Sequence, residues 1–146
     1  MSHFEITELN RRLANMITLG TVAETDYKTA KVRVQIGELL SGWLPWLTAR
    51  ASNDVNWWAP EVGEQVVVIA PSGDLAQGIV LTALYKDQYP PPADHPNVHT
   101  THYDGGADRG GATIEYDREK KHLKALLSNG GNAKLVANDG TIELMA

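Results

Sequence analysis

The sequence predicts an all-β protein with a short N-terminal helix, in which a small Greek-key barrel such as the OB-fold precedes an intertwined β-prism. Three observations predict this architecture. About five short strand patterns fall within residues 18–85, with no long helical pattern between them. A proline-rich segment then interrupts the pattern. Beyond it, short strand patterns recur roughly every nine to twelve residues, each with few apolar side chains.

Residues 1–17 form the predicted helix. Ser2 and Glu5 have the spacing of a capping box, in which each side chain satisfies the backbone N–H of the other residue. Apolar side chains then recur with a helical period at Leu9, Leu13, Met16 and Ile17. We expect this stripe to pack on its own domain, as such stripes usually do. A helix that reaches a neighbouring subunit is the alternative.

Residues 18–88 form the predicted barrel. TVAETD and KVRVQIG flank the turn-like DYKTA and alternate apolar with polar residues, which predicts a hairpin. WLPWLTA is a third strand, in which Pro45 is tolerated only at an edge or a bulge. EQVVVIA is a continuous apolar run, typical of a strand buried on both faces. PSGD then makes a turn, and GIVLTALY supplies the fifth strand.

Residues 89–104 are the predicted connector, or neck. YPPPADHP places four prolines in eight residues, which cannot continue a sheet and favour a stiff, extended segment. We therefore place the domain boundary at this segment.

Residues 105–146 begin with the flexible GGADRGG and continue with four strand patterns, ATIEY, KHLKALLS, NAKLVA and GTIELMA. Each pattern offers two or three modest apolar side chains, and a segment of about 40 residues cannot bury a stable core with so few. Identical copies of the segment are the simplest partners. The side chains that we assign to this shared core are Ile114, Tyr116, Leu123, Leu135, Ile142 and Leu144.

All four tryptophans lie in SGWLPWLTARASNDVNWWAP, residues 41–60. They are either a stacking platform for nucleic-acid bases or packing and interface anchors. The chain has a net charge of −5, and Arg50 and Asp54 cancel within this stretch. Nucleic-acid binding draws most of its affinity from phosphate neutralisation by Lys and Arg.

We therefore interpret the tryptophans as barrel-packing and subunit-interface anchors, and we expect no nucleic-acid partner. A single-stranded nucleic-acid-binding OB-fold module is the alternative function. The residues of this predicted interface are Trp43, Trp46, Trp57 and Trp58, with the turn at Pro60 and Gly63 that holds them.

The sequence offers little catalytic chemistry. It has no cysteine, and no G-x-S-x-G, P-loop or H-E-x-x-H motif, so we predict neither an enzyme nor a cofactor. Glu61 and Glu64 are close in sequence but are expected only to flank the turn before a buried strand. The histidines of the connector, which we expect to be ordinary loop residues rather than metal ligands, are His95, His99 and His102.

Several stretches together resemble the phage baseplate assembly protein V family, the short central spike proteins of contractile-tailed phages and phage-like bacteriocins. These stretches are ANMITLGTVAETD, KVRVQIGEL, GWLPWLTARA and NWWAPEVGEQVVVIAPSGDLAQGIVL. The resemblance runs almost continuously from Asn15 to Tyr85 and resumes at HYDGGADRGGATIEYD. The arrangement WWAP-x-VGEQV is its most specific part.

The resemblance implies a homotrimer in which three OB-folds form a collar attached to the hub of the tail baseplate. Three chains then wind into one triple-stranded β-helix, which helps to pierce the host outer membrane when the sheath contracts. The implied role is structural and its implied location is the virion. The N-terminus lacks the apolar region of a signal peptide, so we expect synthesis in the host cytoplasm.

Two features depart from the family. The resemblance implies a metal site formed by an H-x-H pair near the C-terminal apex. This sequence contains no H-x-H, so we predict no metal. Family members also continue to a pointed tip, whereas TIELMA is still an alternating strand pattern. Either the chain is a shortened form, or a separate tip protein caps its blunt end.

Overall fold

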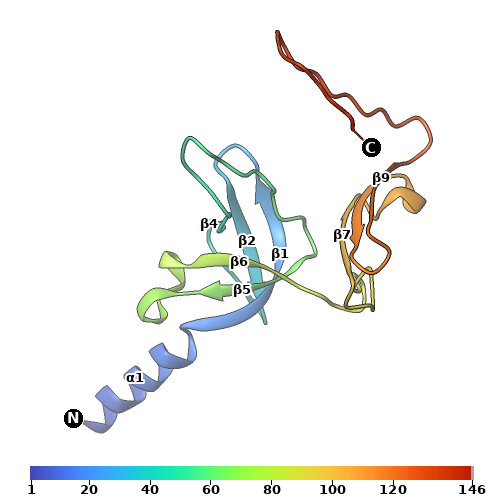
Figure 1. Cartoon of the computed structure of the whole chain (residues 1–146). Coiled ribbons are helices and arrows are strands. Elements are labelled where there is room, and N and C mark those ends of the chain that lie inside the picture. The colour runs from blue at the N-terminus through green and yellow to red at the C-terminus, as the bar shows by residue number, and fades with distance from the viewer. Residues whose placement is uncertain (146) are drawn as a thin grey trace. The chain divides into compact units, whose positions relative to one another are not determined.

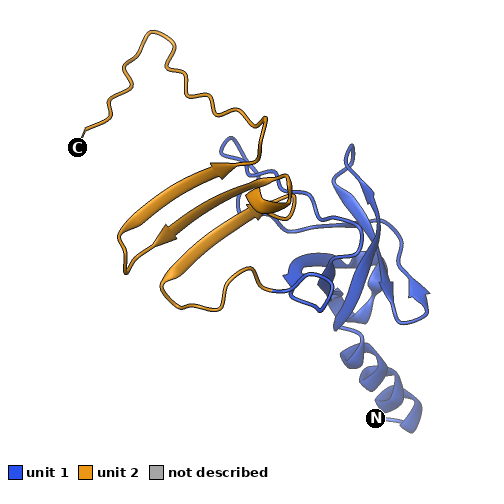
Figure 2. Cartoon of the chain, turned by 90° about the vertical axis from the view of Figure 1, so that its right-hand side faces the viewer, with its two compact units in different colours: residues 1–90 blue, residues 91–146 orange. Residues whose placement is uncertain are grey.

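The computed structural model describes residues 1–145 and divides into two compact units, residues 1–90 and residues 91–146 (Figure 2). The regular secondary structure of both units is mainly β-strand, and the described chain contains one α-helix, α1 (His3–Ala14). The predicted class, mostly β with a short N-terminal helix, is therefore confirmed. Over residues 1–145, no helix combines the length and the apolar surface that crossing a lipid bilayer requires.

Helix α1 begins with the predicted capping box. The Glu5 N–H donates to Ser2 Oγ at 3.2 Å, and the Ser2 N–H donates to the Glu5 carboxylate at 2.6 Å. The helix ends at Ala14, earlier than predicted. No residue of α1 is buried, so the expectation that its stripe packs on its own domain is wrong. Near its C-terminal end, the helix contacts the 3-10 turn η1 (Pro71–Gly73) of the barrel unit, and its N-terminal part projects outward (Figure 1).

The first unit is an antiparallel sheet with strand order β3-β2-β1-β5-β6, in which β4 also pairs with β2. A parallel bridge between Trp46 and Val80 brings the two ends of the sheet together. The third predicted strand is shorter than expected, because Pro45 has no N–H with which to extend the ladder. The strands are β1 (Ile17–Asp26), β2 (Lys31–Ile36), β3 (Leu39–Leu40), β4 (Leu44–Pro45), β5 (Gln65–Ile69) and β6 (Ile79–Leu84).

The core of this unit lies on one face of the sheet. It consists of fully buried aliphatic side chains: Val22, Val32, Val34, Leu44, Val66, Val68 and Val80. The prediction that EQVVVIA is buried on both faces is wrong for the single chain. Val66 and Val68 are fully buried, whereas Ile69, which lies on the opposite face of β5, is 37% exposed.

The second unit contains an antiparallel sheet with strand order β7-β8-β9. Its strands are β7 (Val98–Tyr103), β8 (Ala112–Asp117) and β9 (His122–Leu127), and the loop before β8 contains the 3-10 turn η3 (Ala107–Arg109). Strand β7 lies inside the segment that we predicted to be a connector. The prolines end at Pro96, two residues before β7. The sequence VHTTHY shows only a weak alternation of apolar and polar residues, so the prolines before it led us to predict a connector instead of a strand.

No helix or strand forms in residues 128–145, so the strands predicted for NAKLVA and GTIELMA are absent from the single chain. A strand needs a partner that accepts and donates its backbone hydrogen bonds, and residues 132–145 have no such partner within the described chain. Leu135 and Leu144 are 74% and 94% exposed. The intertwined β-helix therefore stays a prediction.

Candidate assembly interface

The tryptophans divide between packing and exposure. Trp46 packs on the barrel core, and its ring meets that of Trp57 edge-on with 5.5 Å between centroids. Trp57 is nevertheless 59% exposed. Trp43 is 45% exposed and lies 5.8 Å from the guanidinium of Arg33, within the range of a cation–π contact. One ring thus belongs to the core, and two present apolar surface outward.

The predicted turn at Pro60 and Gly63 directly follows the second tryptophan pair and is bonded to β1. Pro60 is buried, and its carbonyl accepts a hydrogen bond from Thr25 Oγ1 at 3.2 Å. Gly63 has φ +97°, a conformation that favours glycine, and its N–H donates to the Val22 carbonyl at 2.8 Å. Trp58, just before this turn, is 62% exposed and lines a cavity of about 330 Å³.

Glu64 also lines this cavity, and burial raises the pKa of its carboxyl group, with a smaller contribution from the charge of Glu61. Glu61 itself is exposed. The backbone of Glu64 pairs with β1, where the Val22 N–H donates to the Glu64 carbonyl at 2.9 Å. Both glutamates flank the turn before β5, as the sequence predicts.

The β7-β8-β9 sheet has one mostly apolar face, which we call the apolar face. The register opposes His99, Tyr116 and Leu123 in one row, and the alternation of side chains places every second residue with them. Three of the predicted core residues therefore come together here. The full set is His99, Thr101, Tyr103, Ala112, Ile114, Tyr116, Leu123, Ala125 and Leu127.

The apolar face is exposed in the single chain. Ile114 is 47% exposed, Tyr116 43% and Leu123 71%. Two further members, Tyr103 and Leu127, were missed by the sequence analysis. The sequence LKALL in β9 contains the signal for Leu127, because every second residue of a strand lies on the same face. However, Leu126 and Leu127 are adjacent and both apolar, so the pattern alone does not show which of them lies on the apolar face.

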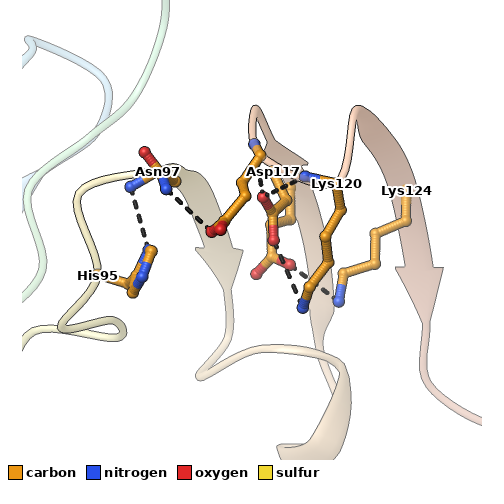
Figure 3. Close-up of polar contacts among 7 residues, drawn as sticks. His95, Asn97, Asp117, Lys120 and Lys124 are labelled. Carbon is orange, nitrogen blue, oxygen red and sulfur yellow. Dashed lines mark hydrogen bonds and ion pairs between the residues drawn. The ribbon is translucent and has the colours of Figure 1, made fainter.

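The opposite face, which we call the polar face, carries the charges (Figure 3). Lys124 Nζ lies 2.9 Å from the Glu115 carboxylate, and Lys120 Nζ lies 3.6 Å from Asp117. The hydrogen bond from Lys124 holds the pKa of Glu115 below its ordinary value. Backbone N–H donation, chiefly from Lys120, lowers the pKa of Asp117.

The loop before β8 covers one end of the polar face. The Ala107 N–H donates to Thr113 Oγ1 at 3.1 Å, and Thr113 is only 7% exposed. Gly106, with φ +94°, lies against the His102 ring, where a β-carbon would fall 2.8 Å from Nδ1. The sheet is therefore more covered on its polar face than on its apolar face.

The three connector histidines do not form a common site. His99 and His102 are three residues apart on β7, so their side chains lie on opposite faces of the sheet. His95 precedes the strand, and its Nδ1 accepts the Asn97 N–H at 3.3 Å (Figure 3). Within residues 1–145, no group of three or more His, Cys, Asp or Glu side chains is placed to hold a metal ion.

The comparisons with known proteins identify the barrel first. Residues 18–85 match the family described as the Type VI secretion system/phage-baseplate injector OB domain. The barrel unit is thus an OB domain of the class found in phage-like injectors.

A second comparison extends beyond the OB domain. It is 41% identical over 119 residues to the spike protein of Escherichia phage P2, an alignment that covers 81% of this chain and 54% of the phage protein. The chain belongs to the phage baseplate V/spike family, as the sequence analysis predicts. It spans about half the length of this relative.

Proposed function

We propose that the protein is a structural component of a contractile phage tail baseplate, where three copies form the central spike. The relationship to a phage spike protein supports the tail role, and the injector OB domain supports attachment to the baseplate. The proposed partners are two further copies and the hub protein that holds the OB collar. The assembled spike crosses the host outer membrane when the sheath contracts.

The exposed apolar face carries the proposal of a homotrimer. An antiparallel sheet with one solvated face normally turns its polar face to water and buries its apolar face. In this chain the arrangement is reversed: Leu123 is 71% exposed, whereas the side chain of Asp117 is 13% exposed. A single layer of three strands needs a second layer against which to bury its apolar face, and the described chain leaves this face exposed. Another molecule must cover this face.

Copies of the same chain meet this requirement economically. Three sheets that turn their apolar faces toward a common axis bury one another and leave the Lys124–Glu115 ion pair on the outside. Strands β7 and β9 are the edges of the described sheet, and each edge offers backbone groups to a neighbouring chain. Residues 128–145 would gain ladder partners in the same way.

Such a shared shaft suits a mechanical role. Unfolding one chain requires its separation from two others, which raises the barrier to unfolding under force. The chain's net charge of −5 does not hinder this role, since the proposed role does not require binding to phosphate groups. The exposed rings Trp43, Trp57 and Trp58 are proposed to be contacts of the OB collar with its neighbours.

Quantitative mass spectrometry of purified tail particles tests this function. We expect the protein in each particle at three copies, with labelled antibodies at the baseplate end of the tail. Absence from purified particles would contradict the proposal and favour an assembly chaperone. Binding of single-stranded oligonucleotides that weakens steeply with salt would instead favour the nucleic-acid-binding alternative.

A further inference from the structure

Helix α1 carries an apolar stripe that its own chain leaves uncovered. Ile6, Leu9 and Leu13 follow i, i+3, i+7 spacing and therefore share one side of the helix. They are 44%, 47% and 57% exposed. In addition, the helix carries no net charge, because two glutamates balance two arginines. Its association with another molecule meets no overall charge repulsion.

The joint between α1 and the barrel holds the stripe away from its own sheet. Gly73 has φ +71°, and a β-carbon there would lie 2.4 Å from the Arg12 carbonyl oxygen, so the helix backbone rests directly on this glycine. The Ala70 N–H donates to the Met16 carbonyl at 2.8 Å just beyond the helix. Together these contacts fix the direction in which α1 projects (Figure 1).

The same unit carries an apolar surface of matching kind, which we call the outer patch. It is the face of β1, β5 and β6 opposite the core, and its members are paired across the strands. Ile17 is 67% exposed, Leu19 55% and Ile69 37%. The outer patch consists of Ile17, Leu19, Val67, Ile69, Ile79 and Leu81.

The stripe and the outer patch have similar dimensions. From Ile6 to Leu13 the helix advances about 10 Å along its axis. Three adjacent strands spaced by about 4.8 Å span about 10 Å between the outer two. A helix with side chains is also about 10 Å wide. One helix stripe therefore suffices to cover one outer patch.

We infer that α1 is an exchanged arm, whose stripe docks on the outer patch of a neighbouring copy. This inference rests on the proposed homotrimer. Every interface of a cyclic trimer is heterologous, so each copy needs one donor surface and one different acceptor surface. The stripe and the outer patch supply such a pair, and three arms on three patches close the ring with neither surface left over. The arms would thus lock the collar independently of the shaft.

Cysteine cross-linking of the full chain tests the exchange, because the sequence contains no cysteine. Chains with Leu9→Cys and chains with Leu19→Cys, carrying tags of different mass, are expressed together and oxidised after the native mass is measured. We expect disulfides mainly between the two kinds of chain. Phe4→Cys is the matched control, since Phe4 is 78% exposed and lies on the opposite side of α1 from the stripe. It should cross-link to Leu19→Cys at least tenfold less.

Each outcome decides the inference. A trimeric mass with cross-links between Leu9 and Leu9 would mean that the helices bundle together, and would overturn the exchange. A trimeric mass with no cross-link to Leu19→Cys, from either Leu9→Cys or Leu13→Cys, would overturn the exchange but not the trimer. The stripe would then be a binding surface for a hub protein. A monomeric mass would overturn the trimer and the exchange together.

Discussion

Two leucines on β9 allow a direct test of which face of the distal sheet is buried in the assembly. Leu123 lies on the apolar face and is 71% exposed in the single chain, whereas Leu126 lies on the polar face and is 44% exposed. The same change, Leu→Ala, removes the same three carbons at each position. Burial in the single chain predicts that Leu126→Ala is the more destabilising change, whereas burial of the apolar face in a trimer predicts that Leu123→Ala is.

The magnitudes follow from burial. Removing three fully buried carbons costs about 2.4 kcal/mol at about 0.8 kcal/mol per carbon. In the single chain the buried fractions would make Leu123→Ala cost about 0.7 kcal/mol and Leu126→Ala about 1.3 kcal/mol. If three copies bury the apolar face, the further loss at Leu123 is about 1.7 kcal/mol per chain, or about 5 kcal/mol per trimer. That corresponds to a decrease of roughly 10³- to 10⁴-fold in the association constant.

Dilution series followed by light scattering measure this difference. We expect Leu123→Ala to dissociate at a concentration at which the natural chain and Leu126→Ala stay trimeric. Circular dichroism of each variant at high concentration checks that the strands still form. If Leu126→Ala weakens association more than Leu123→Ala, the assignment of the buried face is wrong.

Three further predictions concern the joint, the polar face and the barrel. Gly73→Ala should lower the free energy of unfolding by about 1–3 kcal/mol, because alanine is strained at this φ and its methyl group meets the α1 backbone; thermal unfolding measures it. The pKa of Glu115 is lowered in the folded protein, so its stabilisation is present above its ordinary value of 4.5 and is lost as the pH falls below it. Lys124→Met should therefore flatten the dependence of stability on pH in acid, and an unchanged profile would contradict the role of this ion pair. Trp46→Ala should cost about 3 kcal/mol and Trp43→Ala about 1 kcal/mol in denaturant unfolding, because only the first ring packs on the core; equal costs would contradict that division.

Much of the barrel could be predicted from local patterns. The alternation of KVRVQI and the spacing of Ser2 and Glu5 each depend on neighbours a few residues away, and both predictions are confirmed. The apolar run of EQVVVIA correctly predicted a strand. It did not reveal that the chain itself covers only one face, because coverage depends on residues distant in sequence or on other molecules.

The second unit was less predictable, for related reasons. The prolines before residue 97 hid β7, whose threonines and histidines give a weak alternation. Residues 133–145 alternate apolar with polar side chains as a strand does, but they form no strand in the single chain. Local alternation does not reveal whether a partner strand is present to satisfy the backbone hydrogen bonds. The alternation within β8 placed Ile114 and Tyr116 on one face, whereas Leu123 joins them through the register of β8 and β9. Their role in a shared core stays a prediction.

Native molar mass tests the central claim, that three copies share one structure, most directly. Light scattering in dilute buffer, and again in detergent without boiling, should give about three times the chain mass of 15.9 kDa under both conditions. A mass near 15.9 kDa in dilute buffer would contradict the shared shaft and leave the apolar face without its proposed cover.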